Sequence, residues 1–543
     1  MSTQVAFTAP HFAATEIGHR FLSDGANAID AMVAASAAIS VVYPHMNSLA
    51  GDGFWLIQRM GQTPIAIDAC GTSAKRATIQ WYQDKDLKSI PERGGLAALC
   101  LGGTLDGWRV ARNYHIENKS ELRQKSLSEL LTPSIVLANE GIEVSQSLQL
   151  ASEKVQSEFA EFTDYQEIFC PQGRTLKKGD WLRNPSLGLF LKQIAEEGTE
   201  SFFKGDIAKN LSDWLKFQNS PLSLADFRSY SAQIVEPLQT NIRGATLYNL
   251  PAPTQGIASL LILAVYDQLL QDNKVSSEAE HIHCLIEATK QAFLVRDAEV
   301  TDPSRLSERW GSLLTDEHIA TLVAGVNVDQ AMPWPKTAQH GDTVWMSALD
   351  AEGTVVSFIQ SIYWEFGSGL VHPDYGLVWN NRGTSFSLDE EHANALGPIL
   401  KPFHTLNPAL AVFDDGKRLS YGCMGGEGQP QTQAAVFSRF MYQGFGLDEA
   451  ISRGRWLLGR TWGDQNQDLK LEQDLYELLG DDLARKGHKI TPVEAQTELM
   501  GHAGAIYVRP DGNCEAATDP RSDGNALVSE ILLLGLANHE QMR

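Results

Sequence analysis

Thr343 stands at an abrupt boundary in the sequence. Residues 323–342 show no hydrophobic period and contain two prolines, and an alternating strand pattern begins at once with TVWMSAL. A threonine hydroxyl is a weak nucleophile, but an α-amine on the same residue can act as its base when that residue is N-terminal. This chemistry requires cleavage of the peptide bond between Asp342 and Thr343. The residue type alone leaves open a purely structural threonine, which is the common case at a strand start.

Other patterns with chemical potential are weaker. His281 and His283 precede Cys284 and suggest a metal site, but positions i and i+2 of a helix point apart, and we find no carboxylate at ligand spacing. Gly51 and Gly53 in AGDGF follow a helix and lack the order of a nucleotide-binding loop. The sequence has no P-loop, no GxSxG elbow and no HExxH motif. We therefore predict no metal and no cofactor.

The composition narrows the class of protein. The chain has 543 residues, of which 43% are hydrophobic and 20% charged, as in ordinary globular proteins. Its 44 basic and 67 acidic residues give a net charge of −23, which argues against nucleic acid and anionic membranes as partners.

Targeting signals and cysteines point to the cytoplasm. The N-terminal MSTQVAFTAPHFAATEIGHRF has no basic region followed by an apolar one, so we see no secretory signal. The most apolar run, residues 31–42, is too short to cross a bilayer. The six cysteines are scattered without a CxxC pair, and we expect reduced thiols.

The elements that must position Thr343 follow from the pattern of the whole chain. Two helices are predicted on either side of Gly25, followed by a strand pair in SLAGDGFWLIQRMGQTPIAIDA. Residues 120–300 are mostly helical, and short strands joined by DAEG, DDGK and PDGN turns follow Thr343. This order predicts a layered α/β architecture.

The chain resembles the γ-glutamyltransferase family of N-terminal-nucleophile (Ntn) hydrolases over nearly its whole length. In the second half, the matching motifs are Thr343 with its DAEG turn, FGSGLV, WNNRG, KPFHTLNPAL, GCMGGEGQPQ and AATDPRSDG. In the first half, DGANAIDAMVAASAAISVVYPHMNSLAGDGFWLI resembles the family's opening helix and its G-G-G-F strand.

The resemblance implies a four-layer αββα sandwich and self-cleavage between Asp342 and Thr343. The products would be a large chain (1–342) and a small chain (343–543), which together form one αββα unit. Thr343 would be the nucleophile, and Ser361 would support its new α-amine. Gly425 and Gly426 match the pair whose N–H groups form the oxyanion hole, and glycine suits converging N–H groups. The partners implied are a small amide and the two cleaved chains, as one heterodimer or a dimer of heterodimers.

The residues that hold a free amino acid in γ-glutamyl enzymes are replaced here. The family uses Arg and two Ser for the α-carboxylate, and Asn, Gln and Asp for the α-amine. The residues at these positions are Cys70, His404, Thr405, Tyr363, Arg382 and Ser385. A pocket that loses Asp and gains Arg should repel an α-ammonium group and prefer an anion.

These substitutions favour a compact, carboxylate-bearing amide. QSIYWEFGSG and NNRGTSFSLD resemble the oxamate amidohydrolase branch of the family, which acts in purine breakdown. Arg382 would hold the oxamate carboxylate, and hydrolysis would release oxalate and ammonia. The alternatives are a γ-glutamyl hydrolase or transferase, an acylase of larger amides, or an unprocessed, non-catalytic homologue. Arg382 pairing with an acidic side chain, and His404 as a buried polar residue, also stay open.

Overall fold

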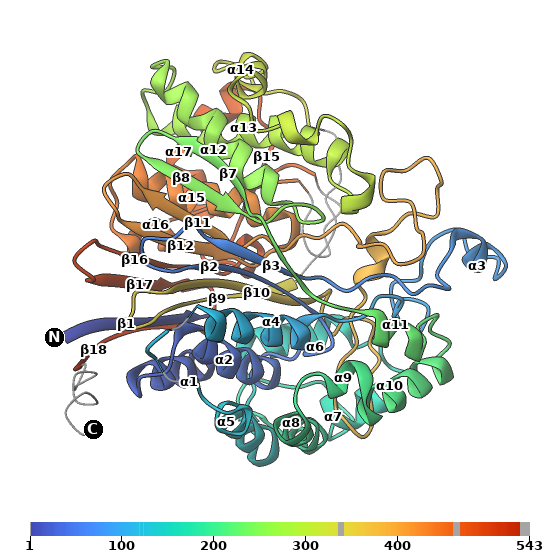
Figure 1. The fold of residues 1–543 in the computed structure, drawn as a ribbon. Coiled ribbons are helices and arrows are strands. Elements are labelled where there is room, and N and C mark those ends of the chain that lie inside the picture. The colour runs from blue at the N-terminus through green and yellow to red at the C-terminus, as the bar shows by residue number, and fades with distance from the viewer. Residues whose placement is uncertain (1, 119, 123, 335–341, 460–466, 533–543) are drawn as a thin grey trace.

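The computed structural model describes residues 2–118, 120–122, 124–334, 342–459 and 467–532 (Figure 1). Two antiparallel sheets lie face to face in the middle of the molecule, and helices cover both outer faces (Figure 1). The four-layer αββα sandwich predicted from the sequence is confirmed. The division into two chains at Thr343 stays a prediction, and residues 335–341 of the predicted linker lie outside the described part.

The first sheet has seven strands and carries Thr343 near its centre. In spatial order the strands are β18 (Asn525–Leu532), β1 (Ser2–Ala9), β9 (Asp342–Leu349), β10 (Val355–Tyr363), β2 (Asp52–Gln58), β3 (Ile65–Ala69) and β6 (Gln233–Val235). Every neighbouring pair in this sheet is antiparallel. The predicted hairpin of β9 and β10 around the DAEG turn is therefore present.

The second sheet has six antiparallel strands. In spatial order they are β17 (Cys514–Thr518), β16 (Ala503–Val508), β12 (Arg418–Cys423), β11 (Ala409–Phe413), β8 (Ala245–Asn249) and β7 (Leu238–Ile242). A core between the sheets includes Phe54, Trp345, Ile359, Leu410 and Ile506. The period of two in β10 explains this layering, because Val355 and Ile359 face the second sheet while Val356 and Phe358 face the helices.

Helices close the outer faces and complete two further cores. The outer face of the seven-stranded sheet is covered by α1 (Phe12–Ser23), α2 (Ala28–Val42) and α4 (Thr104–Glu117), and α5 (Leu127–Glu140) and α8 (Pro185–Glu197) pack beyond α2 (Figure 1). The six-stranded sheet is covered by α12 (Gly256–Gln271) and α15 (Gln429–Met441), and α13 (Glu278–Glu299) packs against these two helices (Figure 1). All 15 residues of α2 are buried, and its alanines and serines allow this close packing.

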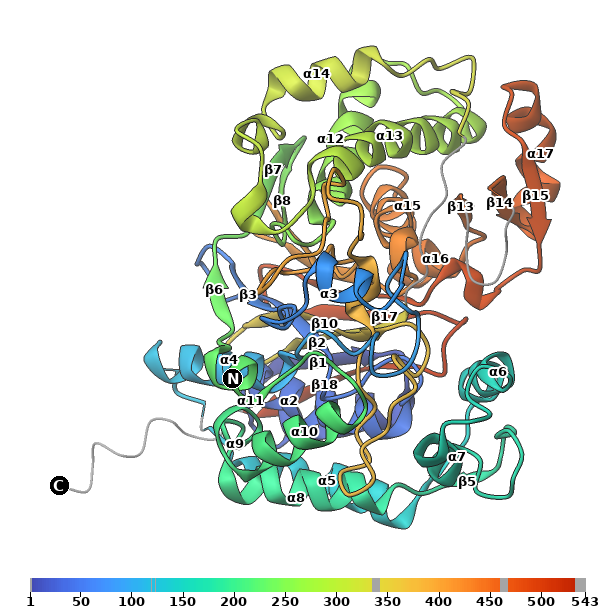
Figure 2. The ribbon, with the colours of Figure 1, turned by 90° about the vertical axis from the view of Figure 1, so that its right-hand side faces the viewer.

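A smaller unit stands beside the second helical layer. It combines β13 (Trp456–Leu458), β14 (Leu469–Glu472) and β15 (Ile490–Val493) with α17 (Gln473–Arg485) (Figure 2). The remaining helices are α3 (Ile79–Gln83), α6 (Gln146–Val155), α7 (Thr163–Phe169), α9 (Ser201–Lys204), α10 (Asp206–Phe217), α11 (Leu224–Ser229), α14 (Asp316–Ala324) and α16 (Leu447–Ser452). A short ribbon pairs β4 (Ile142–Glu143) with β5 (Trp181–Leu182). None of the helices in the described residues has the length and apolar character needed to cross a bilayer.

Candidate active site

Thr343 is fully buried at the start of β9, between β1 and β10. The next residue, Val344, pairs with Gln360 of β10, so the strand is anchored immediately after the threonine. The side-chain amide of Gln429, the first residue of α15, donates to Thr343 Oγ1 over 3.3 Å. This contact brings the start of a helix from the second layer to the threonine hydroxyl. The Asp342 side chain lies outside the described residues.

Ser361 lies near the end of β10, where the strand becomes irregular. The pairing with β9 shifts between Gln360 and Tyr363, and Tyr363 has a φ of 86°. A non-glycine residue with such a backbone angle is strained, and backbone strain of this kind concentrates at functional sites. The amide N–H of Tyr363 donates to Ser361 Oγ over 2.8 Å. The irregularity turns both side chains toward Arg382.

Arg382 is a fully buried cation at the start of a short 3-10 helix, Arg382–Ser385. Its Nη2 lies 3.5 Å from Ser361 Oγ and its Nη1 3.3 Å from Thr405 Oγ1, both long contacts. The guanidinium lies 3.9 Å from the centre of the Tyr363 ring, and its Nε has no hydrogen-bond partner. No carboxylate of the described residues forms an ion pair with it. Burial lowers the pKa of Arg382, but an arginine stays protonated.

Ser385 contacts the backbone of Arg382, and Thr405 contacts its guanidinium. The Ser385 hydroxyl is within hydrogen-bond distance of the carbonyls of Arg382 (2.9 Å) and Phe403 (3.1 Å). Ser385 also lines a cavity of about 230 Å³ together with Phe403 and Glu427. The Thr405 hydroxyl accepts from Arg382 and its carbonyl accepts from the side-chain amide of Gln255. The backbone around Arg382 is therefore held from two sides.

His404 binds a carboxyl group that the sequence analysis did not single out. Its Nδ1 accepts from the Leu406 amide over 3.4 Å, so Nε2 carries the proton and donates to Asp52 over 2.9 Å. The amide of Gly71 also donates to Asp52, over 2.7 Å. Burial raises the pKa of Asp52 to about 7, against the opposing effects of the Gly71 amide and of Arg382. Burial also holds the pKa of His404 well below its usual value.

Gly425 and Gly426 connect β12 to α15 in a conformation that favours glycine. Their φ angles are 124° and 54°, both in the region that L-side chains rarely adopt. Within the described part of the chain, neither of their amide N–H groups donates a hydrogen bond. Pro430 lies in the first turn of α15, whose N-terminal dipole favours negative charge nearby. Two unpaired donors at this point suit a developing oxyanion.

A polar brace links the glycine turn to the loop of His404 and Thr405. The Gln255 amide donates to the carbonyls of Thr405 (2.7 Å) and Gly426 (2.9 Å). Arg296 of α13 in turn donates to Gln255 Oε1 over 3.1 Å and to Glu427 over 2.6 Å. All three side chains are buried, so this network fixes the two loops relative to each other.

Contacts link most of the residues predicted for the site, and they include two residues that were not predicted. Ser361, Tyr363 and Thr405 contact Arg382, whereas Ser385 contacts only its carbonyl and His404 contacts Asp52. The missed residues are Asp52 and Gln429. Asp52 replaces the middle glycine of the family's G-G-G-F strand, which was a usable signal. Cys70, at the family's arginine position, is fully buried, and all six cysteines are unpaired thiols.

One sequence expectation about metal ligands is wrong. His281 does point away, toward Tyr266, as the helical spacing predicted. His283, however, has a carboxylate at ligand spacing, because Glu287 follows it by one helical turn in α13, and His488 joins them from a distant segment. The spacing of His283 and Glu287, four positions apart on one helix, was the local signal for this pair.

Comparison with known proteins shows the family of this chain. A family model described as gamma-glutamyltranspeptidase matches residues 14–529. The chain belongs to this family. It is 44% identical to an oxamate amidohydrolase proenzyme of Klebsiella pneumoniae over 97% of this chain and 98% of the relative. It is 34% identical to a glutathione hydrolase-like proenzyme, YwrD, of Bacillus subtilis over 97% of this chain and 99% of the relative.

The solved structures agree with the family assignment. A crystal structure of cephalosporin acylase from Bacillus halodurans superposes with a TM-score of 0.87 at 27% identity, covering 97% of this chain and 96% of that one. This member of the gamma-glutamyltranspeptidase family is therefore an amide-hydrolysing enzyme with the Ntn-hydrolase fold, and its relatives are made as proenzymes.

Proposed function

We propose that this enzyme cleaves itself between Asp342 and Thr343 and then hydrolyses a small amide that carries a carboxylate. Oxamate is the substrate that fits best, with oxalate and ammonia as products. The observation that carries this proposal is Arg382, a buried guanidinium with two long hydroxyl contacts and an unpartnered Nε. The similarity to the Klebsiella relative supports the same choice.

The charge balance of the pocket favours an anion. A buried cation without a carboxylate partner is costly, and a substrate carboxylate would relieve that cost through charge-assisted hydrogen bonds. The Tyr363 ring covers one face of the guanidinium. Asp52 does not offer a subsite for an α-ammonium group, since it is buried and already accepts from His404 and Gly71.

The proposed reaction assigns each group one role. The free α-amine of Thr343 takes the proton of the hydroxyl as Oγ1 attacks the amide carbon. The oxyanion that forms is stabilised by the N–H groups of Gly425 and Gly426. The protonated amine returns its proton to the leaving nitrogen, the carbon–nitrogen bond breaks, and ammonia departs. Water then attacks the ester on Thr343 by the same route and releases the second carboxylate.

Ser361 and Gln429 position the nucleophile in this scheme. Ser361 supports the α-amine with its hydroxyl, while the Tyr363 amide fixes that hydroxyl from the other side. Gln429 donates to Thr343 Oγ1 and so orients the attacking oxygen. Both residues act on Thr343 rather than on the substrate.

A γ-glutamyl hydrolase or transferase is the second candidate, favoured by the family match and by the Bacillus relative. The two readings are separated by assaying processed enzyme with oxamate, with longer dicarboxylic monoamides and with a γ-glutamyl anilide. We expect ammonia and oxalate from oxamate and at least 100-fold lower kcat/KM with the anilide. Its α-carboxylate lies three carbons further from the scissile amide than that of oxamate and its α-ammonium group is repelled by Arg382, so a misplaced charge-assisted anchor costs about 3 kcal/mol. Turnover of the anilide alone would overturn the substrate assignment.

We also propose that the enzyme works in the cytoplasm as a heterodimer of its two cleaved chains. The six free, buried cysteines fit a reducing compartment. A denaturing gel with N-terminal sequencing tests the heterodimer. Two bands, the smaller beginning TVWMS, are expected, whereas one band of 59.7 kDa in active material contradicts the mechanism.

A further inference from the structure

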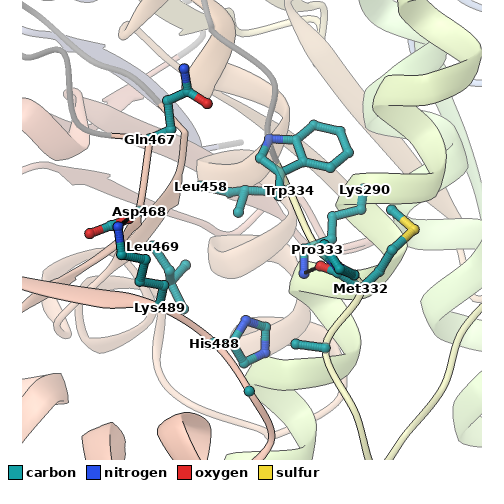
Figure 3. A pocket seen from close by; sticks show the side chains of 12 residues that line it. Lys290, Met332, Pro333, Trp334, Leu458, Gln467, Asp468, Leu469, His488 and Lys489 are labelled. Atoms are coloured by element: carbon teal, nitrogen blue, oxygen red, sulfur yellow. Dashed lines mark hydrogen bonds and ion pairs between the residues drawn. The ribbon is translucent and has the colours of Figure 1, made fainter.

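A cluster of potential metal ligands lies apart from the residues assigned above, where α13 meets the segment after α17. It consists of His283, Glu287 and His488, with exposed fractions of 0%, 0% and 7%. One potential ligand atom from each lies within 4.8 Å of the others. Figure 3 shows His488 at the edge of a cavity of about 390 Å³, which Lys290, Met332 and Trp334 also line.

The hydrogen bonds of the two histidines show which nitrogens could bind an ion. His283 Nε2 lies 2.9 Å from the carbonyl of Asn327, so this nitrogen carries the proton. His283 Nδ1 is then a lone-pair donor, and it lies 2.8 Å from Nε2 of His488. One proton is therefore shared between the two rings. A carbonyl that fixes the outer nitrogen of an imidazole is the usual support of a metal-binding histidine.

We propose that His283, Glu287 and His488 form a binding site for Zn²⁺. Two imidazoles and one carboxylate are a donor set that zinc takes with a water molecule as its fourth ligand. The cavity beside His488 gives that water a place. Zn–N bonds of about 2.0–2.1 Å in a tetrahedron put the nitrogens about 3.3 Å apart, so the rings need to separate by about 0.5 Å.

Lys290 competes with the ion for the same carboxylate. Its Nζ donates to Glu287 Oε1 over 2.6 Å and to the carbonyl of Met332 over 2.6 Å, while the Met332 amide donates to Glu287 Oε2 over 3.0 Å. Zinc binding must draw one Glu287 oxygen away from the ammonium group. The Lys290–Glu287 ion pair therefore lowers the affinity for zinc, and replacing Lys290 with an uncharged residue should raise that affinity.

The site would join the two chains that the proposed cleavage produces. His283 and Glu287 belong to residues 1–342 and His488 to residues 343–543. The ligands also hold the carbonyl of Asn327 and the amide of Met332, which lie on the segment leading to the cleavage site. An ion here would cross-link the end of the large chain to the small chain. The binding test below needs neither the cleavage nor the substrate.

The test is calorimetric titration of tag-free, chelator-treated enzyme with Zn²⁺. We expect one ion bound per 543-residue chain with no net proton release, because His488 frees Nε2 for the ion by carrying its proton on Nδ1 instead. Titrations in buffers of different ionisation enthalpy check the proton count. His283→Gln and His488→Gln should each weaken binding at least tenfold. Lys290→Met should tighten binding about tenfold, because the competing positive charge is gone.

His318→Gln is the matched control, because His318 lies on α14 outside the cluster and should leave binding unchanged. Circular dichroism of each variant checks that it is folded. Sub-stoichiometric binding to the wild type overturns the site. So does equal affinity in the folded His488→Gln variant, or weaker binding in Lys290→Met.

Discussion

Asp52 and Arg382 are buried ionisable groups of the candidate active site, and each affects the pKa of the other. Arg382 lowers the pKa of Asp52 and Asp52 raises the pKa of Arg382, in both cases against the effect of burial. With the pKa of Asp52 at about 7, its carboxyl group is largely neutral below that pH and leaves the guanidinium free for a substrate. The residue types alone do not predict the raised pKa of Asp52, because the shift arises from the burial of a group that distant segments enclose.

Replacing Arg382 should separate substrate binding from folding and self-cleavage. Arg382→Gln removes the charge that holds the substrate carboxylate, and we expect kcat/KM for oxamate to fall about 10²–10³-fold, mostly through KM. Arg382→Lys should recover part of this loss, since it restores the charge without the planar fork. Steady-state kinetics measure both. An unchanged KM in Arg382→Gln contradicts the assigned contact.

Asp52 should make substrate binding depend on pH. As the pH rises through about 7, Asp52 ionises and competes with the substrate carboxylate for Arg382, so KM should rise above that pH. Asp52→Asn should give a KM that stays constant across the same range. The sign for stability is separate. Between about pH 4 and 7 the folded state holds a proton that the unfolded state has released, so the Asp52 contribution to the unfolding free energy falls as pH rises.

Thr343 should be needed twice, for cleavage and for turnover. Thr343→Ala lacks the hydroxyl, and we expect a single band of 59.7 kDa with no hydrolysis of oxamate. Thr343→Ser keeps the hydroxyl and should still be processed, more slowly. Gel analysis over time reads the first step, and ammonia release reads the second. Processing of the alanine variant would remove Thr343 from the mechanism.

At the scale of elements, two distorted strand ends build the site. The end of β10 turns Ser361 and Tyr363 to one side through a shift in register, and the end of β12 presents two glycines with positive φ. The first distortion lets the Tyr363 amide bond the Ser361 hydroxyl, and the second leaves the amides of Gly425 and Gly426 without partners among the described residues. The Gln255 brace holds the second distortion in place.

Gly425→Ala tests whether the glycine turn serves the chemistry. At a φ of 124° alanine is strained, and the new Cβ lies 3.4 Å from Gly501 Cα, so the amide donors should move. We expect kcat to fall about 10²-fold with little change in KM. Gly444→Ala is the control, since it has a φ of 73° and open space around it. An equal loss of kcat in both variants would assign the effect to strain alone.

The sequence predicts the elements better than the contacts between them. The alternation in TVWMSAL and the DAEG turn were enough to predict β9 and β10, because each depends on local spacing. The partnership of Asp52 with His404 joins residues 352 positions apart, so no local period reports it. The same limit explains why His488 was not joined to His283 and Glu287, although those two residues are one helical turn apart.

At the scale of the molecule, the seven-stranded sheet interleaves the two proposed chains. Residues 1–342 supply β1, β2, β3 and β6, while residues 343–543 supply β9, β10 and β18. Neither chain contains all the strands of either large sheet. The cleaved enzyme should therefore elute as one species in size-exclusion chromatography and regain little activity after unfolding in urea, whereas the uncleaved Thr343→Ala precursor should refold. Full recovery of the cleaved enzyme would contradict this.

The pairing of β1 with β18 allows a circular permutation of the chain. Ser2 lies opposite Leu532, so the first and last described residues lie side by side at one edge of the seven-stranded sheet. A circular permutant that begins at Thr343, with a short peptide joining Leu532 to Ser2, keeps every strand neighbour. Once its initiator methionine is removed, such a polypeptide starts with the free α-amine of Thr343. It should then be active without cleavage of an Asp342–Thr343 bond.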